Sequence, residues 1–382
     1  MTRVIITGGG TAGHTNPGIA TAQALVLRGL AVEDIHFIGG ERGNEGTIVP
    51  EAGFSIDLLP GRGLKRSFSP SNLGALLDLA RGAVRAFRLI RRHRPDVVVC
   101  LGGYAAFGAS FAAILQRVPV VVTEQNARAS IVNRVIGRFA KACAVPFPDT
   151  DLPSSILTGN PVRPAVVDAV VSADRRTTRR ERGFEEGAVA VAVWSGSLGA
   201  KSVNRAVRAL AEQWSERTDI TIHHIVGRRD WPDFGGSEIE GPIDYRTIEY
   251  EDDMPTLLAA ADVAICRSGA STVTELAVAG LPSLLVPLPG APRDHQRANS
   301  RELVDVGGAL LLDDSELSGR RLADMLGPIV DDEGRRRDMA AAARSVGRPG
   351  AADAVAGLVL RIAEIDVSAF PDPPDLPMNR TI

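Results

Sequence analysis

Glycines follow an apolar run at the start of the chain, in a pattern that suits phosphate chemistry. Gly8, Gly10 and Gly13 come after Val4–Thr7 and match G-x-G-x-x-G, and His14 follows the last glycine directly. Glycine after a parallel strand lets backbone N–H groups and the positive end of the next helix face an anion. A neutral imidazole at such a helix start can accept a proton. The pattern indicates a phosphate-bearing ligand beside a candidate base, with simple helix capping by His14 as the alternative.

A redox dinucleotide is one interpretation of this first glycine loop. The dinucleotide fingerprint needs an acidic residue after the second strand, about 20 residues on, to bind a ribose diol. Here the second strand-like run ends in Gly39 and Gly40, and Glu41 comes later than that spacing. A nicotinamide-dependent oxidoreductase is therefore poorly supported.

The richest constellation lies between Cys266 and Ser300. Ser268 and the two residues after it predict a turn at the end of a strand, and Ser271 and Thr272 begin a helix whose N–H groups can hold a phosphate. Glu275 follows one turn later, where its carboxylate can accept two hydrogen bonds from a ribose diol. The structural alternative is a capping box formed by Thr272 and Glu275.

Two further features fit a sugar nucleotide. Gln296 and Asn299 lie three residues apart on the next expected helix, so their amides share a face and can bind sugar hydroxyls. A second glycine loop, SGSLGAKS, begins at Ser195 after another apolar run. Each half of the chain thus has a strand that ends in a glycine loop.

Composition limits the remaining classes of function. With 382 residues, 45% of them hydrophobic, two globular domains are expected. The net charge of −3 gives no reason to expect nucleic acid as a partner. Cys100, Cys143 and Cys266 lie far apart, so disulfides and cysteine metal sites are not expected.

Asp252 and Asp253 are interpreted as a helix start, and neither a metal nor another cofactor is expected. The N-terminal apolar run is too short for a signal peptide.

Strand-like runs alternate with helical stretches along the whole chain. This alternation predicts βαβ units and parallel sheets, and two sets of about five strands exceed one compact sheet. The prediction is an α/β protein with two doubly wound domains. The expected strands lie at 4–7, 34–39, 96–101, 118–124, 141–145, 190–196, 220–227, 244–250, 263–269, 282–288 and 308–312.

One uncharged segment is long enough to raise the question of a membrane span. Val97–Leu115 has 19 residues without a charge. Gly102 and Gly103 interrupt it, and the residues before them are rich in β-branched side chains. The segment is therefore predicted to form a strand, a glycine turn and a buried helix.

Two basic segments have plainer interpretations. Arg62–Arg94 mixes arginines with Leu, Phe and Ile, which suits either a core-packed helix with a solvated basic face or a surface for an anionic membrane. Ala173–Gly183 is interpreted as the solvated end of a helix. It follows Leu157–Pro164, where glycine and two prolines predict the domain junction.

The motifs GGGTAGHTNP, GGY, TEQNA, GNPVR, GSLGA, CRSGASTVTELAVAGLPS and DHQRAN occur in an order that resembles the MurG family of peptidoglycan glycosyltransferases. The resemblance runs from about Val4 to about Ile365. It implies two Rossmann-like domains facing across a cleft, the GT-B architecture. Residues 1–161 would bind the lipid acceptor on the membrane side and 162–349 the UDP-sugar. A return helix at about 350–366 would complete the first domain, and the proline-rich tail 367–382 is expected to be disordered.

The resemblance also implies roles for individual residues. Glu275 would bind the ribose, the backbone at Glu251 the uracil, and Gln296 hydroxyls of the N-acetylglucosamine. Tyr104 would line the acceptor site. The residues implied to bind UDP-N-acetylglucosamine are Thr11, Ala12, Gly13, Asn126, Arg163, Ser197, Glu251, Ala270, Ser271, Thr272, Val273, Thr274, Glu275 and Gln296.

The reaction implied is an inverting transfer. The C4 hydroxyl of lipid I would attack the anomeric carbon of UDP-N-acetylglucosamine and release UDP, giving lipid II. His14 is the first candidate for the base and Glu124 the alternative, with helix ends and Arg163 stabilising the leaving group. Such an enzyme would work at the cytoplasmic face of the cell membrane as a peripheral protein in contact with anionic lipid.

The sequence departs from the family pattern at several positions. Ala12 and Ser195 stand where glycine is usual, Ala105–Gly108 differs from the usual residues after GGY, and His295 precedes Gln296 where some members have two glutamines. These changes concern substrate affinity more than reaction type. A related sugar-nucleotide enzyme with another acceptor, an epimerase, and a non-catalytic UDP-N-acetylglucosamine-binding paralogue stay open as alternatives.

Overall fold

The computed structural model describes residues 3–9, 12–60, 71–172, 174–236 and 238–365. The chain forms two compact α/β units. The first unit comprises Met1–Arg163 and Pro349–Ile382, and the second comprises Pro164–Arg348. Each contains one parallel sheet with helices on both faces, so the predicted α/β class with two doubly wound, Rossmann-like domains is confirmed.

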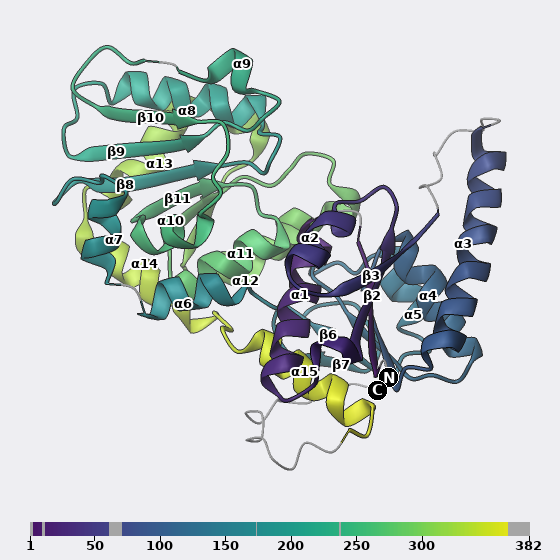
Figure 1. Ribbon diagram of the computed structural model, residues 1–382. Helices are drawn as coiled ribbons and strands as arrows, with labels where there is room; N and C mark the ends of the chain where they lie inside the picture. Colours follow the sequence, from purple (N-terminus) through teal and green to yellow (C-terminus); the bar gives the residue numbers. More distant parts are fainter. Residues whose placement is uncertain (1–2, 10–11, 61–70, 173, 237, 366–382) are drawn as a thin grey trace. The chain divides into compact units, whose positions relative to one another are not determined.

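The first unit is built on one parallel sheet (Figure 1). Its strands are β1 (Val4–Gly8), β2 (Ile35–Gly40), β3 (Ser55–Leu59), β4 (Val97–Gly102), β5 (Val120–Thr123), β6 (Ala142–Val145) and β7 (Ser155–Leu157). Its helices are α1 (Ala12–Leu27), α2 (Glu45–Glu51), α3 (Ser71–His93), α4 (Tyr104–Leu115), α5 (Ile131–Ile136) and α15 (Ala351–Ile362). The strand order is β3-β2-β1-β4-β5-β6-β7, and the switch between β1 and β4 is where such sheets place their ligands.

The second unit repeats this plan. Its strands are β8 (Val189–Trp194), β9 (Ile220–Ile225), β10 (Asp244–Ile248), β11 (Val263–Cys266), β12 (Ser283–Leu285) and β13 (Ala309–Leu311), in the order β10-β9-β8-β11-β12-β13. Its helices are α6 (Pro164–Ser172), α7 (Arg175–Glu181), α8 (Lys201–Gln213), α9 (Trp231–Phe234), α10 (Met254–Ala260), α11 (Ala270–Ala279), α12 (His295–Asp305), α13 (Gly319–Val330) and α14 (Glu333–Ser345). The switch lies between β8 and β11.

Alternate residues of the buried strands fill two separate cores. In β1, Val4 and Ile6 pack with residues of α1, α2 and α15, whereas Ile5 packs on the other face with α3, α4 and α5. Side chains of a strand alternate between faces, so a strand covered on both sides reads as a continuous apolar run. This is why the central strands were readable from the sequence.

The edges of the first sheet were missed. Strands β3 and β7 were not predicted, because an edge strand needs little apolar sequence. Four of the five residues in β3 are exposed or half-buried, and β7 has three half-buried residues. The uncharged segment Val97–Leu115 forms β4 and α4 as predicted. Within the described residues, none of the helices combines the length and apolar character that crossing a bilayer requires.

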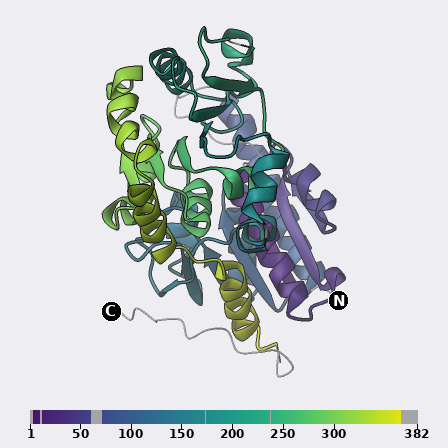
Figure 2. The ribbon, with the colours of Figure 1, turned by 90° about the vertical axis from the view of Figure 1, so that its left-hand side faces the viewer.

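The last helix of the chain returns to the first unit. Helix α15 packs along α1 (Figure 1, Figure 2), and Val355 and Val359 are fully buried there. Arg28, one residue beyond α1, donates two hydrogen bonds of 2.6 Å to the carboxylate of Asp353. The Arg28 side chain is only 8% exposed, so this ion pair fixes α15 at its first turn. The tail predicted at 367–382 lies outside the described residues.

Replacing Asp353 by alanine tests this attachment. The change leaves the buried Arg28 guanidinium without its acceptor, so the free energy of unfolding should fall by about 2 kcal/mol. Denaturant unfolding followed by circular dichroism measures it. Arg361→Ala is the control, because Arg361 is an exposed residue of the same helix. Equal stability of Asp353→Ala and the control would contradict the assigned role.

Candidate functional site

Glycines at the carboxyl edge of the first sheet bring three strand ends close together. A Cβ atom on Gly103, which has φ +89°, would lie 2.9 Å from the carbonyl oxygen of Gly9. A Cβ on Gly40 would overlap the hydroxyl of Tyr104. The loops after β1, β2 and β4 therefore meet, and any larger side chain at these glycines would force them apart.

His14 follows the first glycine loop along the chain, near the start of α1. Helix α1 begins at Ala12, so His14 is the third residue of the helix and half-buried, inside the first turn rather than at the cap. Gly13 is exposed. Thr11 lies outside the described residues. The position leaves the imidazole near the positive end of the helix, as the sequence predicted.

A buried carboxylate that the sequence analysis did not single out supports the first glycine loop. Glu45, the first residue of α2, is 1% exposed and accepts a 2.8 Å hydrogen bond from the backbone N–H of Gly40. A Cβ on Gly9 or Gly43 would overlap its carboxylate. Three glycine backbones thus surround one acid. From the sequence, only Glu41 was weighed at this strand end, as a ribose ligand, and Glu45 four residues later was not considered.

Glu124 organises the loop that follows β5. The residue is almost fully buried, with 2% of its surface exposed. One carboxylate oxygen accepts hydrogen bonds from the backbone N–H groups of Gln125 and Asn126 and from the Asn126 amide. The other accepts from the Ser130 N–H and the Asn133 amide, each at 2.9 Å. A buried carboxylate that accepts hydrogen bonds from five N–H donors fixes the loop, and both of its oxygens are engaged by that loop.

Tyr104 and Arg163 occupy different parts of the first unit. Tyr104 opens α4 and is half-buried against Gly40; burial raises the pKa of its phenol, and the nearby Glu45 carboxylate raises it further. Arg163 is the last residue of the first unit before α6 and is half-buried. The structure therefore groups Tyr104 with the glycine loops, whereas Arg163 sits at the crossing into the second unit.

The carboxyl edge of the second sheet carries the clearest ligand signal. Helix α11 begins at Ala270 with Gly269 as its N-cap, so Thr272 lies inside the helix and the capping-box alternative is wrong. The hydroxyls of Ser195, Ser268 and Ser271 are buried and have no hydrogen-bond partner among the described residues. Buried polar groups in folded proteins nearly always have a hydrogen-bond partner. Several buried hydroxyls without one, close to a helix N-terminus, therefore indicate a site for a polar ligand.

The six residues of α11 that were predicted to bind the donor differ in how exposed they are. Ser271, Thr272 and Glu275 are half-buried, on the accessible side of the first turn and a half. Ala270, Val273 and Thr274 are buried, and the Thr274 hydroxyl donates back to the carbonyl of Ala270. Three of the six predicted residues can therefore present side chains to a ligand. The others contribute backbone N–H groups and packing.

The second glycine loop is held by a buried polar network. A Cβ on Gly199 would lie 2.0 Å from the carbonyl oxygen of Val226, so the loops after β8 and β9 touch. The amide of Asn204 donates to that carbonyl at 3.0 Å and to Asp230 at 3.2 Å. Ser197, in the same loop, is exposed and its carbonyl accepts from the Arg228 N–H. The network fixes the loop and leaves Ser197 accessible.

His224 anchors this network from β9. Its Nε2 lies 3.1 Å from Asn204 Oδ1 and its Nδ1 lies 2.9 Å from the Tyr245 hydroxyl. Because the Asn204 amide nitrogen already donates elsewhere, Oδ1 is the acceptor and His224 carries its proton on Nε2. Burial, together with a smaller effect of the neighbouring His223, lowers the pKa of His224 to about 3. The imidazole is neutral in the folded protein.

Glu251 points inward rather than toward a ligand. Its carboxylate accepts from Arg182 at 2.8 Å and from the backbone N–H of Asp253 at 2.9 Å, and His223 Nε2 lies 3.2 Å away. Burial alone would raise the pKa of Glu251, but the hydrogen bonds from Arg182 and Asp253 hold it below its ordinary value. Asp253 caps α10 through the Thr256 N–H, as the helix-start interpretation predicted.

The amides on α12 have separate environments. Gln296 is half-buried and its Oε1 accepts from the Leu288 N–H at 2.9 Å, so this side chain also holds the loop before the helix. Asn299 is fully buried and donates to the carbonyl of Ser268. Only Gln296 of the two can reach a ligand, through its amide nitrogen. Asn299 instead links α12 to the turn before α11.

One group of side chains in the described residues could hold a metal, far along the strands from the glycine loops. Asp57 Oδ2 lies 3.0 Å from His36 Nε2 and 3.8 Å from His93 Nε2. The two imidazoles stack at 4.4 Å between centroids, and Arg85 lies 3.5 Å from the same carboxylate. Both imidazoles already lie near one carboxylate oxygen, and the Arg85 guanidinium lies near the other. The arrangement fits an ion pair better than a metal centre.

Two doubly wound sheets, each with glycine loops at its carboxyl edge, define a two-domain Rossmann-like protein of the class that binds phosphate-bearing ligands. Residues 4–145 match the model of the glycosyltransferase family 28 N-terminal domain, and residues 190–355 match that of its C-terminal domain. The chain belongs to glycosyltransferase family 28.

Two relatives and one crystal structure are similar to this chain over almost its whole length. A protein of Desulforudis audaxviator is 36% identical over 372 residues, covering 94% of this chain and 98% of its own. One of Mycolicibacterium smegmatis is 40% identical and covers 94% of each chain. Both are named UDP-N-acetylglucosamine–N-acetylmuramyl-(pentapeptide) pyrophosphoryl-undecaprenol N-acetylglucosamine transferase. The crystal structure of Acinetobacter baumannii MurG aligns with a TM-score of 0.77 at 26% identity, covering 94% of this chain and 100% of that one.

The buried neutral His224 predicts a pH dependence of stability. Below pH 6.5 the unfolded chain binds a proton on this imidazole, whereas the folded protein does not until pH falls to about 3. This one group should lower the free energy of unfolding by about 1.4 kcal/mol per pH unit as the pH falls through that window. The measurement is denaturant unfolding between pH 7 and pH 5. In His224→Gln, which keeps a donor and an acceptor, that contribution should vanish. An unchanged difference between variant and wild type across this range would show that His224 is not the group responsible.

Proposed function

We propose that the protein is an inverting glycosyltransferase of peptidoglycan synthesis. It moves N-acetylglucosamine from UDP-N-acetylglucosamine to the C4 hydroxyl of the N-acetylmuramoyl group of lipid I and forms lipid II. The names of relatives that match almost the whole chain support this substrate pair. The observation on the molecule itself that carries the proposal is the group of unpartnered serine hydroxyls at the start of α11.

The second unit binds the donor, UDP-N-acetylglucosamine. The N-terminus of α11, with Ser271 and Thr272, takes the diphosphate, because free N–H groups and the helix dipole favour an anion there. Glu275 accepts hydrogen bonds from the ribose, and the backbone around Glu251 receives the uracil. Arg182 and His223 hold that backbone in place through the Glu251 carboxylate.

Further residues complete the proposed donor site. Gln296 offers its amide nitrogen to hydroxyls of the sugar, since its oxygen is engaged by Leu288. Ser197 and Arg163 act on the diphosphate. Asn126, held by Glu124, approaches the donor sugar together with the first glycine loop, Thr11–Gly13.

The first unit binds the acceptor and supplies the base, with Tyr104 lining the acceptor site. His14 takes the proton of the C4 hydroxyl as that oxygen attacks the anomeric carbon. The bond from that carbon to the diphosphate breaks, UDP leaves, and the configuration changes from α to β. We assign this role to His14 over Glu124, because the Glu124 carboxylate already accepts five hydrogen bonds. Glu124 is a positioning residue for Asn126.

The lipid acceptor requires the protein to approach a membrane, at its cytoplasmic face. Helices α3 and α4 present exposed apolar side chains around a cavity of about 510 Å³: Val84, Phe87, Phe107, Phe111 and Leu115. Exposed arginines flank them on α3, among them Arg81, Arg88 and Arg92. An apolar patch beside cations suits insertion at an anionic leaflet, so we propose that this surface contacts the membrane.

Transfer of labelled N-acetylglucosamine to a lipid I analogue tests the function directly. The expected result is a labelled lipid product and one UDP released per sugar transferred. UDP release without a labelled lipid, or conversion of UDP-N-acetylglucosamine to an epimer, would assign the chain to one of the alternative activities. Binding of UDP-N-acetylglucosamine with no turnover would identify a non-catalytic paralogue.

The base assignment predicts the effect of His14→Ala. Loss of general base catalysis should lower kcat by roughly 10²–10⁴-fold with little change in the KM for UDP-N-acetylglucosamine. Steady-state kinetics with the lipid I analogue measures both constants. Near-normal turnover would exclude His14 as the base.

The membrane surface predicts the behaviour of Phe107→Ser/Phe111→Ser. Removing two exposed rings should weaken association with vesicles of anionic lipid by about tenfold or more, and salt should release the wild type. Flotation of protein with vesicles is the measurement. Phe139→Ser is the control, since Phe139 is 61% exposed but lies outside this patch. If the control lost as much binding as the double variant, the patch would not be the contact surface.

A further inference from the structure

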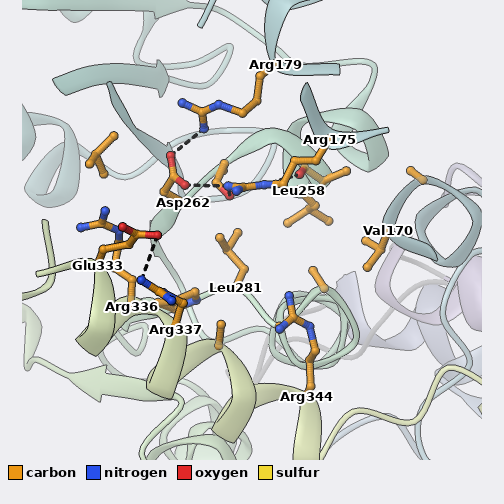
Figure 3. Close-up of a pocket in the computed structure, with 18 of the residues that line it drawn as sticks. Val170, Arg175, Arg179, Leu258, Asp262, Leu281, Glu333, Arg336, Arg337 and Arg344 are labelled. Carbon is orange, nitrogen blue, oxygen red and sulfur yellow. Dashed lines mark hydrogen bonds and ion pairs between the residues drawn. The ribbon is translucent and has the colours of Figure 1, made fainter. Parts of the chain in front are cut away.

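A second cavity, of about 760 Å³, lies in the second unit at the sheet edge opposite the glycine loops (Figure 3). Three of its lining residues lie at the amino ends of strands: Val189 opens β8, Asp262 comes just before β11, and Pro282 just before β12. Gly280, at the carboxyl end of α11, also lines it. The proposed diphosphate site is at the other end of that helix, about 15 Å away along ten residues.

The charges around this cavity are unbalanced. Its lining includes five arginines against two acids, Asp262 and Glu333, which leaves an excess of three positive charges. The arginines come from two helices, α7 and α14, on different sides of the cavity (Figure 3). They are Arg175, Arg179, Arg336, Arg337 and Arg344.

The arginines of α7 form the inner wall. Arg175 and Arg179 each lie 2.6 Å from the Asp262 carboxylate, and Arg179 also donates to the carbonyls of Ala188 and Ala260. The side chain of Arg179 is 14% exposed, and that of Arg175 is 52% exposed. The prediction that this basic run is simply a solvated helix end was therefore wrong. One acid is shared by two guanidinium groups, so the wall stays positive.

The arginines of α14 are more available. Arg337 is paired with Glu333 at 3.2 Å, and both side chains are at least 70% exposed. Arg336 donates to the last carbonyls of α13 through one nitrogen only. Arg344 is exposed and makes neither an ion pair nor a side-chain hydrogen bond to the residues the structure describes; its side chain lies against Gly280. Positions 333, 337 and 344 share one helix face by their spacing.

We propose that this cavity binds a small polyanion with three or more phosphate groups. Guanidinium groups bind phosphate oxygens in pairs, and those of Arg344, Arg337 and Arg175 reach the opening from two helices. Its volume is in the range of small-molecule sites, and apolar residues such as Ala340 and Leu281 line it beside the arginines and suit a non-phosphate part of the ligand. The ligand is either an inorganic polyphosphate or a nucleoside polyphosphate, which share this chemistry.

Titration calorimetry with saturating UDP in both cell and syringe tests the proposal. UDP keeps the donor site filled, so heat from added inorganic triphosphate or adenosine triphosphate reports a separate site. Binding of the inorganic probe alone supports the first source, and tighter binding of the nucleotide supports the second. Absence of binding by both probes would overturn the proposal.

Charge variants on α14 locate the site. Arg344→Ala should weaken binding of the triphosphate by about tenfold, and Glu333→Gln should strengthen it several-fold by removing a negative charge. Arg335→Ala is the matched control, because Arg335 is exposed on the same helix but does not line the cavity. Should Arg344→Ala fail to fold, Glu333→Gln alone decides. Wild-type affinity in Glu333→Gln, or equal losses in Arg344→Ala and the control, would overturn the assignment.

Discussion

Close backbone contact at the carboxyl ends of the parallel strands is the constraint on which the rest of this structure depends. Gly103 touches the backbone of Gly9 in the first unit, and Gly199 touches Val226 and Gly227 in the second. Parallel strands deliver their ends to one edge, and only glycine lets neighbouring loops meet there without side chains between them. What remains at that edge is a surface of backbone N–H groups and helix N-termini, which suits phosphate.

In both units, buried polar side chains hold these loops in place through hydrogen bonds. Glu45 and Glu124 accept N–H groups of the loops in the first unit. In the second unit, Asn204 donates to the carbonyl of Val226 in the loop after β9, and His224 donates to Asn204. Both carboxylate oxygens of Glu124 and every polar side-chain atom of Asn204 and His224 are hydrogen-bonded, and a satisfied buried network adds rigidity at little cost. Rigid loops are what a transferase needs to orient a sugar against its acceptor.

The sequence predicted the parts of this arrangement that have a local signature. Apolar runs ending in glycine located the central strands, and the uncharged segment containing Gly102 and Gly103 was rightly divided into strand and helix. The edge strands β3 and β7 escaped, because half-exposed strands lack a continuous apolar pattern.

Long-range partners escaped for a different reason. Nothing near Arg179 in the sequence indicates that it meets Asp262, 83 residues later. The capping box at Thr272 failed because the helix starts two residues earlier, at Ala270. The pairing of Arg179 with Asp262 depends on topology, which local pattern does not encode.

The central claim is that the donor's diphosphate binds at the N-terminus of α11 and the adjoining loop after β8. Amide hydrogen exchange with and without UDP tests it most directly, because exchange reports protection peptide by peptide. The account predicts slower exchange in Ala270–Glu275 and Ser195–Lys201 when UDP is bound. Protection confined to α7 and α14, or absent from the start of α11, would contradict it.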